Sequence, residues 1–385
     1  MLHLRRASQG GRGGMSQPMD IVIFGLSLTS SWGNGHATTY RALIRGLAEQ
    51  GHRVLFLERD VPWYADRRDL PEPGFCELDL YTDLGAVLAR HADRLHKADA
   101  VIVGSYVPDG IDLIDRLAAM GLRQLCFYDI DTPVTLARLE QGEEAYLSRR
   151  QIPLFDIYLS FSGGRVLDRL QRDWGARRAE ALYCSVDPQR YRPTGAAKTW
   201  DLGYLGTYSP DRQVRLAELL IQPARVLPEM RFVVAGPQYP DDIDWPANVE
   251  RIEHLPPEDH AAFYSCQRFT LNVTRDDMIA AGWSPSVRLF EAAACATPVI
   301  SDPWPGLTDL FPEGRAIVIA RDRADVMAAL HRPEADARSL GAQARRIVAH
   351  DHTGAARARH LVRALQAGAG GQSQEQENSL EGLMR

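Results

Sequence analysis

The sequence predicts an α/β protein made of two doubly wound domains that face each other across a cleft. Short, nearly continuous apolar runs alternate with amphipathic stretches along most of the 385 residues. This alternation is typical of parallel strands that are buried on both faces and connected by crossover helices. A segment rich in proline, glycine and polar residues, 187–200, interrupts it once. We therefore expect a first domain at 20–186, a linker at 187–200 and a second domain at 201–350.

The expected elements follow the apolar runs in order. In the first domain the predicted strands are 20–25, 53–58, 98–106, 125–131, 155–162 and 180–187, with helices at 36–50, 83–96, 109–120 and 163–173. In the second domain the predicted strands are 201–208, 231–236, 269–274, 298–302 and 316–321. A helical stretch at 335–365 has a break near 350–353, and its last part, 351–366, is expected to pack back on the first domain. The ends, 1–19 and 367–385, are predicted to be a disordered leader and tail.

Composition argues against several classes of protein. The chain is 45% apolar and 24% charged with a formal net charge of −6, which disfavours nucleic acid or an acidic membrane as the main partner. No apolar window is long enough to span a membrane. The five cysteines are scattered and never form a C-x-x-C pair. We therefore expect a cytoplasmic protein without a disulfide framework or a structural zinc site.

The stretch 284–311, "SPSVRLFEAAACATPVISDPWPGLTDLF", carries the most specific signal. Ser284, Ser286 and the free N–H groups at the start of the predicted helix would form an anion site, where the helix dipole favours a phosphate. Glu291 lies about one and a half turns into this helix, so it is better placed to accept hydrogen bonds from a ribose diol. The alternative interpretation of Glu291 is a solvated helix residue.

A second stretch, "GYLGTYSPDRQ" at 203–213, predicts a strand that ends at Gly206 and Thr207 before a helix capped by Ser209 and Pro210. Arg212 in this helix suits a diphosphate because a guanidinium gives two parallel charge-assisted bonds. An exposed helix arginine is the alternative. Two further arginines compete for the same role: Arg275 and Arg288.

Both stretches resemble GT-B glycosyltransferases, and 31–60, "SWGNGHATTYRALIRGLAEQGHRVLFLERD", resembles the opening of their CgeB-like branch. The resemblance covers roughly 20–365. It implies two Rossmann-like domains and a nucleoside-diphosphate sugar as co-substrate, with no metal ion or other cofactor. The acceptor would be a glycan, a protein or a small molecule. By the same resemblance, 251–255 would lie against the base, and Gly33, Asn34 and Gly35 would make room for the sugar diphosphate.

One position departs from the family pattern. The common retaining branch has two glutamates eight positions apart, and eight residues before Glu291 stands Trp283. The glutamate that contacts the sugar is therefore absent, which leaves open whether the anomeric configuration is retained or inverted.

Three residues of the first domain are candidates for proton transfer. His36 begins a helix that faces the cleft, where it could act as a general base, donate a hydrogen bond to substrate or merely cap the helix. Asp129 and Asp131 end a strand, and an inverting transferase needs a carboxylate to take the acceptor proton. Asp131 is the first choice and Asp129 the second. The alternative is that Asp131 caps the helix that begins at Thr132.

Other functions remain open. A non-hydrolysing nucleotide-sugar epimerase shares the two-domain plan, and a catalytically silent nucleotide-sugar-binding subunit would explain the missing glutamate. An NAD-dependent dehydrogenase is disfavoured because the glycine pattern breaks at Thr38, although Glu58 and Asp60 end the second strand, where a ribose-binding acid would lie. A pyridoxal-dependent phosphorylase is rejected because the only lysines, Lys97 and Lys198, lie at a helix end and in the linker.

Overall fold

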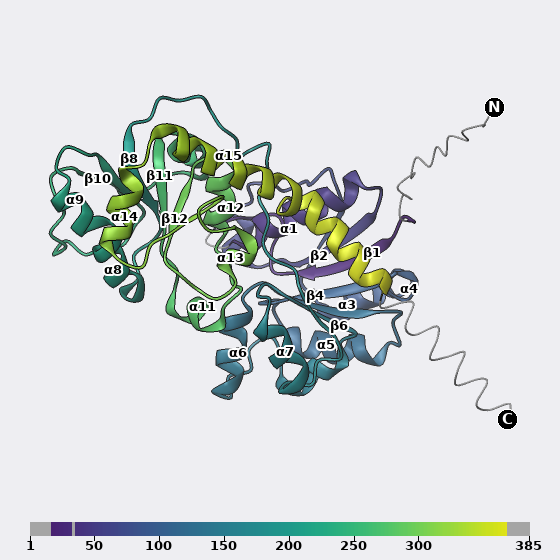
Figure 1. The fold of residues 1–385 in the computed structure, drawn as a ribbon. Coiled ribbons are helices and arrows are strands. Elements are labelled where there is room, and N and C mark those ends of the chain that lie inside the picture. Colours follow the sequence, from purple (N-terminus) through teal and green to yellow (C-terminus); the bar gives the residue numbers. More distant parts are fainter. Residues whose placement is uncertain (1–16, 33–34, 368–385) are drawn as a thin grey trace, which may run out of the picture.

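The computed structural model describes residues 17–32 and 35–367, which form two α/β domains (Figure 1). Every strand pair in both sheets is parallel. The prediction of two doubly wound domains is therefore confirmed. Most of the predicted leader and tail, and the predicted donor-binding residues Gly33 and Asn34, lie outside the described residues.

The first sheet has seven strands in the order β3-β2-β1-β4-β5-β6-β7. Their bounds are β1 Asp20–Gly25, β2 Arg53–Arg59, β3 Glu77–Tyr81, β4 Ala100–Gly104, β5 Leu125–Asp129, β6 Ile157–Ser160 and β7 Ala179–Ala181. The helices are α1 His36–Glu49, α2 Pro62–Ala65, α3 Leu84–Arg90, α4 Ala92–Lys97, α5 Gly110–Ala119, α6 Thr132–Glu140, the 3₁₀ helix η1 Arg149–Leu154 and α7 Arg165–Arg172. Two apolar cores lie on opposite faces of this sheet. Val22 and Phe24 of β1 belong to one core, and Ile21 and Ile23 belong to the other.

The second sheet has six strands in the order β10-β9-β8-β11-β12-β13. Their bounds are β8 Trp200–Leu205, β9 Phe232–Ala235, β10 Val249–Ile252, β11 Gln267–Asn272, β12 Val299–Ser301 and β13 Val318–Ile319. The helices are α8 Pro210–Leu216, the π-helical turn η2 Ala217–Ile221, α9 Gln222–Val226, η3 Pro257–Asp259, α10 His260–Ser265, α11 Asp276–Ala281, α12 Val287–Ala294, α13 Leu307–Leu310, α14 Arg323–Leu330 and α15 Glu334–Asp351. None of the described helices is long and apolar enough to cross a membrane.

The chain passes between the domains twice. The first crossing leads from β7 to β8, and the second follows α15 at His352. A last helix, over residues 354–367, then lies along the first domain (yellow in Figure 1). Its Leu361 and Leu365 share an apolar core with Ile21 of β1 and Leu43 of α1. The buried guanidinium of Arg357 joins the two crossings, because it donates hydrogen bonds to the carbonyls of Tyr183 and Asp351, both at 2.9 Å.

Candidate active site

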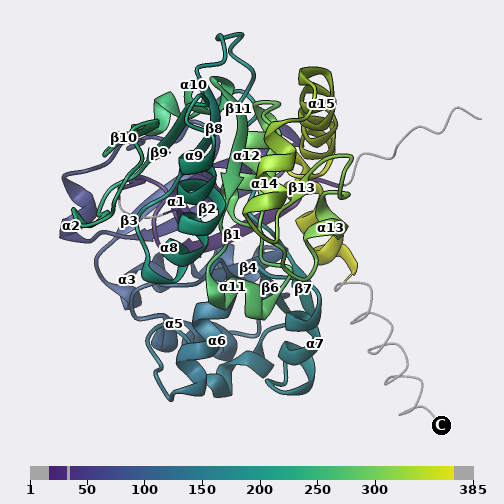
Figure 2. The same ribbon diagram turned by 60° about the vertical axis from the view of Figure 1, so that its left-hand side comes forward.

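The carboxyl ends of the two sheets face each other between the domains. Helix α6, which follows β5, packs against α11, which follows β11 (Figure 2). The amide of Gly163, after β6, donates to the carbonyl of Trp283 at 2.9 Å, and the hydroxyl oxygens of Ser162 and Ser284 are 2.6 Å apart. Ligands of open α/β sheets bind at the carboxyl ends of the strands. The candidate site therefore lies between the two domains.

Three arginines gather on the second-domain side of this site: Arg212 on α8, Arg275 at the N-terminus of α11 and Arg288 on α12. Burial lowers the pKa of Arg212, and the positive charges of Arg288 and Arg275 lower it further. In the described part of the chain, no carboxylate pairs with any of the three. Such a group of uncompensated cations at a strand edge is suited to an anion with several charges.

Arg212 is not the exposed helix residue that the sequence left as an alternative. Its side chain is half-buried, and Nη2 donates to the carbonyl of Thr207 at 2.7 Å. Its Nε is buried and has no hydrogen-bond partner. The loop that holds it is fixed from the other side, since the hydroxyl of Tyr239 donates to the Gly206 carbonyl at 3.0 Å. The predicted residues Gly206, Thr207 and Arg212 thus lie together.

Beside this loop, Arg251 of β10 packs against the rings of Tyr239 and Trp245, at 4.2 and 4.8 Å from their centroids. Its Nη2 donates to the Gly236 carbonyl at 3.0 Å. The segment 251–255, which the resemblance placed against the base, therefore begins beside two aromatic side chains, Tyr239 and Trp245, that follow β9.

Glu291 is buried on α12, with 8% of its surface exposed, so the solvated alternative is wrong. The hydroxyl of Tyr264, on α10, donates to its Oε2 at 3.2 Å. The hydroxyl of Tyr191, from the first crossing, is 3.3 Å from Nδ1 of His260, and burial followed by the nearby Glu291 carboxylate raises the pKa of Tyr191. Glu291 is thus hydrogen-bonded to one phenol and lies near a second, one turn from Arg288 on α12.

The two predicted serines have different surroundings. The Ser286 hydroxyl donates to Oδ1 of Asn272 at 2.9 Å and is partly exposed. The Ser284 hydroxyl is fully buried and is engaged by Ser162 and by the Gly282 carbonyl. The expectation that Ser284 offers its hydroxyl to a phosphate is wrong for this structure, because the contact with the first domain occupies it.

Trp283, eight residues before Glu291, is part of the same domain contact. Its indole N–H donates to Asp309 at 2.8 Å. A Cβ built on Gly164 of the first domain would lie 2.2 Å from its ring, and one on Gly306 would lie 2.4 Å from it. The indole is therefore enclosed by both domains.

On the first-domain side, His36 and Asp131 lie together. His36 Nε2 is 3.5 Å from Asp131 Oδ2; 8% of the histidine side chain is exposed and 44% of the aspartate side chain. His36 also contacts the ring of Tyr106 edge-on, at 5.3 Å between centroids. Its Nδ1 is buried and has no hydrogen-bond partner among the described residues. Asp131 is the N-cap residue of α6, as the capping alternative expected, but its side chain makes no cap hydrogen bond. Gly35 is exposed at the N-cap of α1.

Asp129 is fully buried and does not reach the cleft. Its oxygens accept hydrogen bonds from the hydroxyls of Tyr158 at 2.6 Å and Thr135 at 2.8 Å. Burial raises the pKa of Asp129 to about 6. The second-choice base is therefore a structural carboxylate, and Asp129 and Asp131 do not present a pair of carboxylates to a metal ion. Among the described residues, no group of three or more His, Cys, Asp and Glu side chains could hold a metal ion.

Glu58, the strongest point in favour of a dehydrogenase, is also fully buried. It accepts hydrogen bonds from the amides of Leu28 and Thr29, at 2.6 and 3.0 Å, and from the Thr29 hydroxyl at 2.6 Å. Asp60 pairs with Arg68 at 2.5 Å. Since both acids are engaged by the loops that follow β1 and β2, neither is available to a ribose.

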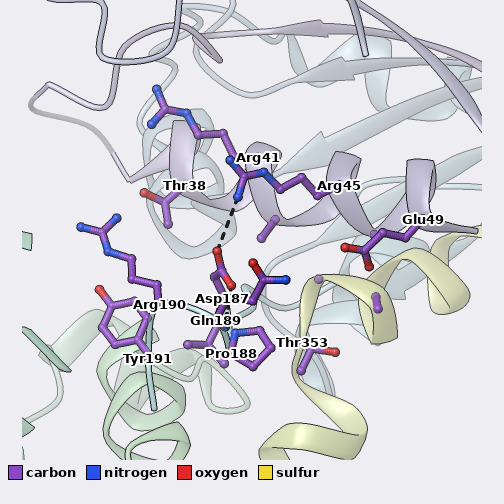
Figure 3. A pocket seen from close by; sticks show the side chains of 15 residues that line it. Thr38, Arg41, Arg45, Glu49, Asp187, Pro188, Gln189, Arg190, Tyr191 and Thr353 are labelled. Carbon is purple, nitrogen blue, oxygen red and sulfur yellow. Dashed lines mark hydrogen bonds and ion pairs between the residues drawn. The ribbon is translucent and has the colours of Figure 1, made fainter. Parts of the chain in front are cut away.

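A separate cavity of about 350 Å³ runs along α1 beside both crossings (Figure 3). Arg45 of α1 and Asp187 of the first crossing face each other in it at 3.6 Å. Tyr191 lines this cavity and also contacts Glu291, so the cavity adjoins the inner end of the candidate site. Among the described residues, none of the catalytic or donor-binding candidates named above lines it.

Sequence reasoning missed Tyr106 and Asn272, which contact predicted residues directly. Tyr106 has a positive φ of 63° in the loop after β4. Asn272 is fully buried at the end of β11. Their position at strand ends was the signal that could have identified them.

Comparisons with known proteins identify the fold. Residues 212–363 match the family model described as "Glycosyl transferase-like". Among solved structures, the chain is similar to sucrose-phosphate synthase from Thermosynechococcus elongatus, with a TM-score of 0.66 and 15% identity over 91% of this chain and 98% of that one. It is also similar to Anabaena HepE in complex with UDP-glucose, with a TM-score of 0.61 and 13% identity over 91% of this chain and 100% of that one.

A third similar structure is the catalytic domain of starch synthase IV from Arabidopsis thaliana bound to ADP and acarbose, with a TM-score of 0.65 and 11% identity over 92% of this chain and 100% of that one. No curated protein matches the sequence. The chain therefore has the GT-B glycosyltransferase fold, and residues 212–363 are similar to the glycosyl transferase-like family. The CgeB-like branch stays a prediction.

Proposed function

We propose that this protein is a cytoplasmic glycosyltransferase that moves a sugar from a nucleoside-diphosphate sugar to a hydroxyl group of an acceptor, without a metal ion. The observation that carries the proposal is the group of three arginines without carboxylate partners, Arg212, Arg275 and Arg288, at the carboxyl edge of the second sheet. HepE, which has the same fold, is seen in complex with UDP-glucose, and starch synthase IV is bound to ADP. The acceptor is a glycan, a protein or a small molecule.

The arrangement assigns a role to each side of the cleft. The arginines and the N-terminus of α12 would stabilise the negative charge that develops on the leaving diphosphate, the task that a bound cation performs elsewhere. Glu291 would accept hydrogen bonds from the ribose. Asp131 would take the proton of the acceptor hydroxyl as the new glycosidic bond forms, and His36 would hold the carboxylate in place.

A thermal-shift panel with UDP, GDP, dTDP, ADP, CMP and NAD tests the donor site. A ligand at about a hundred times its dissociation constant adds roughly 2.7 kcal/mol to the free energy of unfolding. We expect one nucleoside diphosphate to stabilise the protein and NAD to have no effect. Stabilisation by NAD alone would contradict the proposal.

Arg212→Ala and Glu291→Ala are expected to weaken the binding of that nucleoside diphosphate about tenfold or more, because each removes a charged partner of the ligand. Titration calorimetry on the folded variants measures this change. Wild-type affinity in both variants would refute the donor-site assignment. If the wild type binds a nucleotide sugar and releases no nucleoside diphosphate with any acceptor, the chain is a nucleotide-sugar-binding subunit instead.

A further inference from the structure

The buried side chain of Asn272 is hydrogen-bonded to two residues at the candidate site, Ser286 and Arg288. Its Oδ1 accepts hydrogen bonds from Ser286 Oγ at 2.9 Å and from Arg288 Nη1 at 3.0 Å. Its Nδ2 donates to Thr274 Oγ1 at 3.1 Å and to Ser301 Oγ at 2.9 Å. The amide therefore uses both donors and both acceptor positions. Its orientation is fixed by Arg288, because a guanidinium can only donate.

The far side of this network ends on a buried carboxylate. Asp302, with 1% of its surface exposed, follows β12. It accepts hydrogen bonds from the amide and the hydroxyl of Thr274, at 3.0 and 2.8 Å. The Ser301 hydroxyl donates to the carbonyl of Asp302 at 3.0 Å. Both residues that hold the Asn272 amide are thus fixed by the Asp302 turn, and buried networks that are fully satisfied in this way are rigid.

Arg288 is held on its inner side and free on its outer side. Its Nε donates to the Leu205 carbonyl at 2.5 Å, and its guanidinium lies 4.9 Å from the ring centre of Tyr204. Its Nη2 points to the loop after β8, since a Cβ built on Gly206 would lie 2.9 Å from it. The acceptors at the inner side, a carbonyl and an amide oxygen, are both neutral, so the positive charge of Arg288 is not compensated there.

We propose that Asn272 is a positioning residue for the leaving diphosphate. Its amide oxygen aligns the guanidinium of Arg288 without neutralising the arginine, as a carboxylate at this position would. The proposal rests on the donor site of the proposed function and adds to it the residue that orients one of its arginines. Asn272 does not contact the ligand itself, and it acts through Arg288.

Binding of UDP and uridine to Asn272→Ala tests the proposal, with ADP and adenosine or GDP and guanosine replacing them if the panel identifies another base. We expect the dissociation constant for the nucleoside diphosphate to rise about tenfold, as for the loss of a hydrogen bond to a charged group. The dissociation constant for the nucleoside should not change. Asn272→Ser, whose hydroxyl is too short to reach Arg288, replaces the alanine variant if that variant does not fold.

A double-mutant cycle separates positioning from a general structural effect. Because Asn272 acts through Arg288, Asn272→Ala in an Arg288→Met background should weaken diphosphate binding by less than twofold beyond Arg288→Met alone. Asn248→Ala is the matched control, since the Nδ2 of this amide donates to the carbonyls of Ala224, Leu227 and Met230 at 2.9, 3.0 and 3.0 Å. It should lower the melting temperature and leave diphosphate affinity unchanged.

Three results would overturn the proposal while leaving the proposed function intact: unchanged diphosphate affinity in Asn272→Ala, an equal loss of nucleoside affinity, or fully additive losses in the cycle. If the wild type binds none of the nucleoside diphosphates, the proposed function itself fails, and the positioning role fails with it.

Discussion

Asp131 and His36 differ in exposure although they lie side by side. The carboxylate is nearly half exposed to the cleft, and the imidazole beside it is buried. This arrangement leaves one carboxylate oxygen accessible to an acceptor and keeps the other near a ring nitrogen. Asp129, two residues earlier, is enclosed by phenol and hydroxyl donors and has no such access. One strand end thus supplies a structural acid and an accessible one.

Asp131→Asn is therefore expected to keep donor binding and to lower kcat by roughly a hundredfold or more, since the amide cannot accept the acceptor proton. Release of nucleoside diphosphate measures turnover, and calorimetry measures donor affinity. Asp112→Asn is the control, because its carboxylate forms only an exposed pair with Arg116 on α5. Normal turnover in Asp131→Asn would show that another group is the base.

Single residues also show where sequence reasoning reaches its limit. The 203–213 and 284–311 patterns pointed to Arg212, Arg288 and Glu291. Each of these residues lies on a helix that follows a strand, and such helices begin at the carboxyl edge of the sheet, where ligands bind. The patterns could not show that Ser284 is occupied, since its partner Ser162 lies 122 residues away in the other domain. Glu58 favoured a dehydrogenase from its place in the sequence for the same reason. Its hydrogen-bond partners, Leu28 and Thr29, lie about 30 residues earlier and reach it only when the loop after β1 folds against β2.

Among the elements, the second crossing contains the feature most sensitive to pH. The His352 ring stacks on Phe290 of α12, at 4.4 Å between centroids. Its Nδ1 faces Nη2 of Arg357 at 2.6 Å. Since the guanidinium can only donate, this nitrogen must be unprotonated. Burial, together with the nearby charge of Arg357, lowers the pKa of His352 to about 3.

His352 is therefore protonated below about pH 6.5 in the unfolded chain, but only below about pH 3 in the folded chain. The free energy of unfolding rises with pH in this window, so the stability that His352 contributes is complete above pH 6.5 and is lost as the pH falls. Between pH 7.5 and pH 5 the loss is about 2 kcal/mol. We expect His352→Gln, which keeps an acceptor for Arg357, to be less stable at pH 7.5 and to lose about 2 kcal/mol less on acidification. Urea unfolding at both pH values measures this, and equal pH dependence in the two proteins would contradict the assignment.

The order of the helices and strands was predictable from the sequence, but the edge strands of the sheets and the ends of some elements were not. Central strands such as β1 and β4 are apolar throughout because helices cover both faces, and they were found. The edge strands β3, "ELDLY", and β10, "VERI", carry charged residues because they are partly exposed, so no apolar run predicted them. The predicted helix 83–96 is divided at His91 into α3 and α4. The predicted strand 180–187 is reduced to β7, since the chain leaves the sheet for the first crossing.

At the scale of the whole molecule, the contact between Gly164 and Trp283 joins the domains next to the donor site. Gly164 has φ 54° and ψ −132°, a conformation that costs other residues strain. The Trp283 carbonyl accepts a hydrogen bond from the amide of Gly163 in the first domain, and its ring packs against Gly164 and Gly306. The loop that leads into α12 is thus positioned by both domains.

Gly164→Ala should lower the free energy of unfolding by about 2 kcal/mol or more, because it adds a clash with the Trp283 ring to the cost of positive φ. Hydrogen exchange should also increase in 161–164 and 282–286. Gly195→Ala is the matched control, since Gly195 has φ 75° and open space around its Cβ position. If both variants lose the same stability, the ring contact contributes nothing.

The position of the last helix determines when the first domain can be completed during synthesis. Ile21, Ile23 and Leu43 belong to a core that Leu361 and Leu365 close, so this apolar face stays uncovered until residues 361–365 have left the ribosome. Domains at the N-terminus often finish folding while the rest is translated, but this one depends on residues made more than 300 positions later. The nascent chain must therefore keep an unfinished sheet soluble while the second domain is synthesised.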